Sequence, residues 1–63
     1  MNVYFVHYLR YYQSDVTNCN CILNFKDIYD KFDLDDLQHE INNLYCNGVC
    51  TVLVVNFKVL KRI

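Results

Sequence analysis

The chain has 63 residues, of which 54% are hydrophobic and 16% aromatic, and its formal net charge at pH 7 is -1. A chain of this length buries only roughly 60% of the surface that its unfolded form exposes. The high apolar content excludes intrinsic disorder, and the near-neutral charge gives no electrostatic reason to expect direct nucleic-acid binding. We therefore expect one small α+β domain over residues 1–63, helped by association with a partner or a second copy.

The apolar pattern also disfavours export and membrane insertion. The first residues lack the basic start of a signal peptide, and His7 and Arg10 interrupt the apolar stretch. The longest uninterrupted apolar run, Val52–Val55, is too short to cross a bilayer as a helix. We expect a cytoplasmic protein without a membrane partner, in which the four cysteines are mostly reduced.

The first predicted element is a strand over Val3–Tyr12, where β-branched and aromatic residues dominate. Both of its alternate sets are largely apolar: Val3, Phe5, His7, Leu9 and Tyr11 on one side, and Tyr4, Val6, Tyr8, Arg10 and Tyr12 on the other. A sheet covered on one face normally reads apolar on that face and polar on the other. We expect that a second copy or a foreign partner covers the second face.

A polar break at residues 13–15 predicts a turn, and Val16–Phe25 predicts a second strand antiparallel to the first. In this strand one alternate set is apolar: Thr17, Cys19, Cys21, Leu23 and Phe25. The opposite set is mostly polar: Asn18, Asn20 and Asn24. This pattern is typical of a half-buried strand at the edge of a sheet.

A helix is predicted next, because apolar residues recur at helical spacing at Leu34, Leu37, Ile41 and Leu44. Asp33 is the predicted N-cap. Gly48 or Asn47 supplies the left-handed residue that ends the helix.

Val49–Arg62 then predicts a long third strand, so the element order is ββαβ. The strand order 2-1-3, with every neighbour antiparallel, is preferred over 1-2-3 because it makes the two-sided first strand central. The helix then covers one face. We expect the other face to serve self-association, as a homodimer, through Tyr4, Val6, Tyr8, Val52, Val54 and Leu60.

The cysteines lie in two pairs, Cys19-x-Cys21 and Cys46-x3-Cys50. Neither spacing matches a usual zinc knuckle. Buried free thiols are favoured, and a structural zinc or a disulfide remains open. His39 follows Asp35 by four residues, but neither histidine has a serine or a second histidine at a meaningful spacing, and Ser14 is the only serine. We therefore expect no enzymatic activity and no cofactor.

Six of the seven acidic residues lie between residues 27 and 40. On the predicted helix, a polar stripe lies beside the leucine stripe and consists of Asp33, Asp36, Glu40 and Asn43. One interpretation is a solvated flank that favours the helix dipole. The other is an acidic face that imitates nucleic-acid phosphates and enters a basic groove of a partner. The partner-binding residues of this hypothesis are Asp33, Asp35, Asp36, Glu40 and Asn43.

The tyrosines Tyr4, Tyr8 and Tyr12 share a face with Arg10 and indicate a protein interface. Two alternatives remain, a fully internal core position and base stacking as in single-strand binders. A single arginine supplies little of the positive charge that stacking needs.

The chain resembles the very small ββαβ accessory proteins that phages encode. The matching pieces are a tyrosine-rich hairpin strand (Tyr4–Tyr12), a helix that ends in a Leu-Tyr-x-x-Gly-like turn (Leu37–Gly48) and a valine-rich last strand (Val49–Val55). This resemblance implies an anti-CRISPR-like or other anti-defence inhibitor. Such a protein acts in the host cytoplasm by stoichiometric binding of a host defence or nucleic-acid-handling protein, for example a CRISPR nuclease. The alternatives are a self-associating structural or regulatory protein and, less favoured, a zinc-bound nucleic-acid module.

Overall fold

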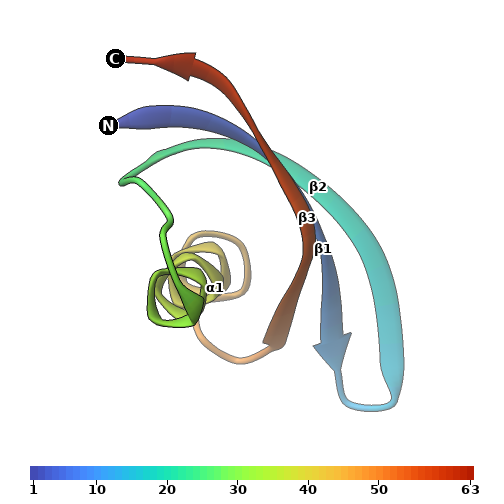
Figure 1. Ribbon diagram of the computed structural model, residues 1–63. Helices are drawn as coiled ribbons and strands as arrows, with labels where there is room; N and C mark the ends of the chain where they lie inside the picture. Colours follow the sequence, from blue (N-terminus) through green and yellow to red (C-terminus); the bar gives the residue numbers. More distant parts are fainter.

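The computed structural model describes all residues from 1 to 63 and contains three strands and one helix. The elements are β1 (Asn2–Tyr12), β2 (Asp15–Phe25), α1 (Lys31–Cys46) and β3 (Thr51–Arg62). They form one sheet in the order β2-β1-β3, and β1 pairs antiparallel with both neighbours (Figure 1). The predicted ββαβ fold class and the predicted strand order are confirmed.

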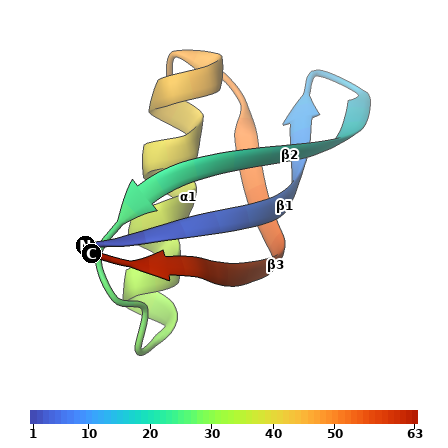
Figure 2. The same cartoon turned by 90° about the horizontal axis from the view of Figure 1, so that it is seen from above.

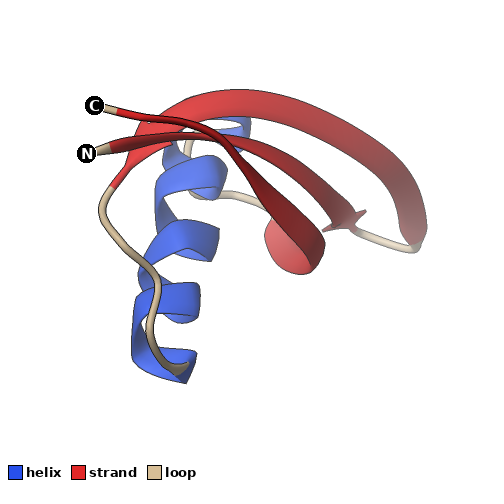
Figure 3. Ribbon diagram, turned by 45° about the horizontal axis from the view of Figure 1, so that its top comes forward, coloured by secondary structure: helices blue, strands red, loops and turns tan.

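The sheet is strongly curved, and α1 lies on its concave side (Figures 1 and 2). No part of the chain crosses the convex side, as the tilted view also shows (Figure 3). The register of β3 against β1 shifts twice, between Val3 and Tyr4 and between His7 and Tyr8. Each shift leaves one extra residue on β3, which bends and twists the strand, so the bulges contribute to the curvature.

The core lies between the concave face and the helix. Tyr4, Val6 and Tyr8 of β1 are 2%, 0% and 4% exposed. Around them pack apolar residues of the other elements: Cys21, Leu23, Phe25, Leu37, Ile41, Val52 and Val54. The tyrosine hydroxyl of Tyr4 keeps a polar partner in this core, because it donates to the Lys26 carbonyl at 2.9 Å.

This arrangement corrects the prediction of the self-association surface. Of its six residues, Tyr4, Val6, Tyr8, Val52 and Val54 are buried beneath the helix, and only Leu60 is substantially exposed. The physical reason is the pairing of β1 with β2. Tyr4 pairs with Leu23 and Val6 with Cys21, so the apolar set of β2 shares their face and the helix covers that face.

The N-cap of the helix lies three residues before the predicted one. Asp30, not Asp33, is the N-cap, since its carboxylate accepts hydrogen bonds from the backbone N–H groups of Phe32 and Asp33, both at 3.0 Å. Asn47 and Gly48 end the helix with φ values of 53° and 79°, as predicted. No helix of the structure has the length and apolar character needed to span a membrane.

Of the predicted helical stripe, Leu37 and Ile41 are fully buried and Leu34 is half-buried. Leu44 is 55% exposed. The stripe therefore predicts the inner face of α1 correctly for Leu34, Leu37 and Ile41 but not for Leu44.

Candidate functional site

The convex face of the sheet carries apolar side chains that the chain itself does not cover. Side chains alternate between the two faces of a strand, and the even-numbered residues of β1 point to the helix. The odd-numbered residues Val3, Phe5, His7, Leu9 and Tyr11 therefore lie on the convex face. The register adds Ile22 beside Phe5 and Leu53 beside Leu9. We call these seven residues the open face.

Several members of the open face are accessible to a partner. Phe5 is 39%, Leu53 is 47% and Ile22 is 59% exposed. A second apolar face was predicted from the sequence, and the structure has one, but it consists of the other alternate set of β1. None of its members belongs to the predicted self-association surface.

Polar and basic residues border the open face. On the β2 side lie Asn18, Asn20 and Asn24, and Asn18 Oδ1 is 3.1 Å from His7 Nε2. On the β3 side Lys58 pairs with Phe5 and Lys61 with Val3. None of the strand residues on this face is an aspartate or glutamate, so its charge is entirely positive.

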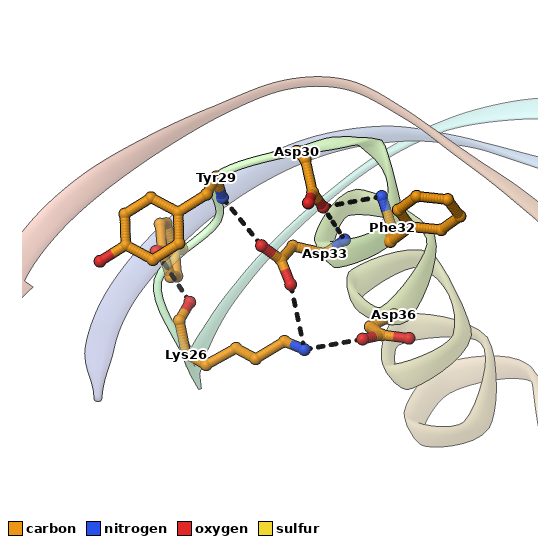
Figure 4. A network of polar contacts seen from close by, with 7 residues as sticks. Lys26, Tyr29, Asp30, Phe32, Asp33 and Asp36 are labelled. Carbon is orange, nitrogen blue, oxygen red and sulfur yellow. Dashed lines mark hydrogen bonds and ion pairs between the residues drawn. The ribbon is translucent and has the colours of Figure 1, made fainter.

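The predicted acidic surface of the helix is partly used by the fold itself. The Lys26 ammonium lies between Asp33 and Asp36, at 3.2 Å and 2.7 Å (Figure 4). Asp33 also accepts the Tyr29 backbone N–H at 3.0 Å. That hydrogen bond, followed by the one from Lys26, holds the pKa of Asp33 below its usual value. The two carboxylates in turn raise the pKa of Lys26, with Asp36 contributing most.

Only part of the predicted acidic set thus remains for a partner. Asp35, Glu40 and Asn43 are exposed and form no salt bridge or side-chain hydrogen bond. Asp36 is exposed but bound to Lys26, and Asp33 is half-buried. The structure does not bring the whole set together as one free patch.

A second polar network lies at one end of the sheet, where β1 begins and β2 and β3 end. The buried Asn2 amide donates to Asp27 and, at 3.2 Å, to the Tyr4 hydroxyl. Asp27 also accepts from Tyr29 at 3.0 Å and from Arg62 at 3.2 Å. The hydrogen bond from Asn2 is the main cause that lowers the pKa of Asp27. Sequence reasoning missed this network, since nothing in the local pattern around Asn2 marks it as buried.

The four cysteines are free thiols: Cys21 and Cys46 are buried, and Cys19 and Cys50 are half-buried. No group of three or more histidine, cysteine or acidic side chains is arranged to hold a metal ion. Burial raises the pKa of Cys21, and a hydrogen bond with Cys46 raises that of Cys50. Raised thiol pKa values keep these groups protonated and weakly nucleophilic at neutral pH.

A groove of about 260 Å³ lies between α1 and the start of β3. Two of its lining residues, Gln38 and Asn42, fasten the helix to the strand. Gln38 Oε1 accepts the Val54 backbone N–H at 2.9 Å, and the Asn42 amide donates to the Cys50 carbonyl. His39 and Asp35 also line the groove but make no contact with each other that would define a catalytic pair. The groove is therefore a helix–strand joint rather than a recognisable reactive centre.

Comparison of the chain with protein-family models, with curated proteins and with solved structures finds no match. The functional interpretation rests on the residues and on their arrangement.

Proposed function

We propose that this protein acts by binding another protein, with the open face as the contact surface. The observation that carries this proposal is the uncovered apolar convex face, on which Phe5, Ile22 and Leu53 are all exposed. A contiguous apolar patch with a polar border is the usual form of an interaction site. In a 63-residue chain these side chains would add to the core if they were folded inward, so their exposure favours a role in binding.

The finer proposal is that the partner is a host defence or nucleic-acid-handling protein that is inhibited stoichiometrically. Its support is the free negative charge of the helix, where Asp35 and Glu40 are exposed and unpaired. Negative charge on a rigid helix complements the basic groove in which such a protein holds nucleic acid. The two surfaces lie on opposite sides of the molecule, so they can be tested separately.

The experiment is a pull-down from host lysate with the tagged protein and two surface variants. Leu53→Lys places a charge in the open face, and the double variant Asp35→Lys/Glu40→Lys reverses the free helix charges. If the open face binds the partner, Leu53→Lys removes the enriched protein and the helix variant retains it. Retention by Leu53→Lys together with loss by the helix variant would transfer the contact to the helix. Far-UV circular dichroism shows that each variant is folded.

A second candidate is binding of single-stranded nucleic acid on the same face. The favouring observation is that Phe5, His7 and Tyr11 lie on one face of the central strand without an acidic neighbour. Lys58 pairs with Phe5, and Lys61 pairs with Val3 at the same end of this face. Aromatic side chains on a sheet next to positive charge can stack bases. Titration of a labelled oligonucleotide at low and high salt distinguishes the two candidates. Binding that weakens steeply with salt and that Phe5→Ala abolishes would favour nucleic acid.

A further inference from the structure

The two edges of the sheet are protected very differently. On β3 the helix shields the edge, because Gln38 accepts the outward N–H of Val54 at 2.9 Å. The two bulges of β3 also break its regularity, and Lys58, Lys61 and Arg62 add charge to it. Bulges, charges and covering elements are the devices by which proteins prevent unwanted pairing at a sheet edge.

β2 has none of these devices. It pairs with β1 in an unbroken register over eleven residues, from Asp15 to Phe25. Between Val16 and Phe25 it contains no proline and no charged residue. No backbone or side-chain hydrogen bond of the structure covers its outer edge, and α1 is fastened to the opposite strand. β2 is therefore a long, regular and open edge.

The register shows which backbone groups of this edge are free. A two-residue turn, Gln13–Ser14, joins the strands, so Tyr12 and Asp15 form the closing hydrogen-bonded pair. Hydrogen-bonded and non-hydrogen-bonded pairs alternate along an antiparallel ladder. The odd-numbered residues of β2 thus bond to β1. The even-numbered residues Val16, Asn18, Asn20, Ile22 and Asn24 direct their N–H and C=O groups outward.

We propose that β2 pairs with β2 of a second copy, antiparallel about a two-fold axis at Asn20, to form a continuous six-stranded sheet. With the axis at Asn20, Asn18 faces the second copy's Ile22 and Val16 faces its Asn24. All five outward-facing residues then find partners, and about ten hydrogen bonds form between the chains. This inference does not rest on the proposed function, since it uses the outward backbone groups of β2 and not the side chains of the open face.

The regularity of β2 selects a second copy in this orientation. A second β2 is as long and as unbroken as the first, so antiparallel pairing about the axis uses the outward groups of all five even-numbered residues in both chains. The contact is isologous, so it closes as a dimer and leaves only the protected β3 edges at the outside.

The experiment measures association by sedimentation equilibrium from about 1 to 300 μM, a range suited to a micromolar interface. Asn20→Pro removes the outward N–H at the axis. A monomer tolerates this change, because the group is not used in its own sheet. We expect a dimer of the wild type and a dissociation constant at least about tenfold higher for Asn20→Pro. The control, Asn20→Ala, keeps the N–H and is expected to dimerise within about threefold of the wild type. Circular dichroism verifies that both variants are folded.

A charge pair tests the register. Asn18→Lys alone should leave the dimer unimproved, while adding Ile22→Glu in the same chain places a lysine against a glutamate twice across the axis and should strengthen it. A wild type that is monomeric up to about 300 μM overturns the proposal. A dimer that Asn20→Pro leaves intact overturns it as well, since the contact would then lie on another surface, such as the open face.

Discussion

The assignment of the two sheet faces leads to a sharp prediction about two valines. Val6 is 0% exposed in the centre of the core, and Val16 is 56% exposed at the start of β2. Replacing Val6 by alanine removes two carbon groups from the core, which costs about 1.6 kcal/mol of transfer free energy. The cavity, on the order of 50 Å³, adds about 1 kcal/mol. We expect a total loss of about 3 kcal/mol in the free energy of unfolding.

Val16→Ala is the matched control, because it makes the same chemical change on an exposed site. We expect it to cost less than about 1 kcal/mol, mostly through strand propensity. The assay is urea unfolding followed by circular dichroism, with the slope checked for constancy among variants.

The core of such a small domain supplies at most about 3–5 kcal/mol, so Val6→Ala leaves only about 0–2 kcal/mol of stability and a short folded baseline in urea. Ile41→Val, also at 0% exposure, is the milder second probe, with an expected cost of about 1 kcal/mol. If Val16→Ala cost as much as Val6→Ala, and Ile41→Val cost nothing, the helix would not cover the face that carries Val6. The open face would then have to be reassigned.

Three further predictions concern the turn, the helix start and pH. Gln13 has a φ of 55° at the first position of the hairpin turn, where glycine is favoured and a side chain causes backbone strain. Gln13→Gly should therefore increase the free energy of unfolding by roughly 0.5–1 kcal/mol and raise the thermal midpoint. A lowered midpoint would show that the backbone is not strained at Gln13. Asp30→Ala should cost about 1 kcal/mol in urea unfolding through loss of the N-cap, and Asp30→Asn much less; equal costs would refute the capping role. The lowered pKa of Asp33 contributes stability that is present above its unfolded value of 3.8 and lost as pH falls through the folded value. Asp33→Asn should therefore flatten the decline of the thermal midpoint below about pH 4, and an unchanged slope would contradict this linkage.

The fold was predictable because different patterns in the sequence agree. The asparagines of Val16–Phe25 indicate an edge strand, the two-sided apolarity of the first strand indicates a central one, and the helix requires a return of the chain. These three constraints permit the observed order β2-β1-β3. The helix end was also predictable, since Asn47 and Gly48 both tolerate positive φ.

The choice of face could not be made from the first strand alone, because both of its alternate sets are apolar. The pairing of the first strand with the second shows which set faces the core. A two-residue turn pairs Tyr4 with Leu23 and Phe5 with Ile22, so the asparagines of β2 share a face with Phe5 and not with Tyr4. Applied before the faces were assigned, this register would have placed the tyrosines in the core.

The N-cap was misplaced for a different reason. Asp30 and Asp33 are both acceptable caps by residue type, and the apolar stripe begins only after the second. The first turn, with Lys31 and Phe32, adds nothing to that stripe, since Phe32 is 67% exposed. Periodicity therefore cannot detect this turn. Its start is decided by the two hydrogen bonds that Asp30 accepts.

The structure also changes how strongly each of two surfaces, the acidic residues of the helix and the open face, is supported as a binding site. Four of the six acidic residues between positions 27 and 40 have a role inside the molecule. Asp30 caps the helix, Asp33 and Asp36 bind Lys26, and Asp27 binds Asn2. Folding alone is thus a sufficient reason for most of these charges, and only Asp35 and Glu40 require another explanation.

The fold itself gives no comparable reason for the apolar side chains of the open face. Phe5, Ile22 and Leu53 do not belong to the core between the sheet and the helix, and they expose apolar surface to water. Their side chains also make none of the polar contacts that stabilise the fold. A small domain gains nothing from such residues as an isolated monomer. Because the fold accounts for the acidic helix better than for the convex face, the convex face carries the stronger argument for binding.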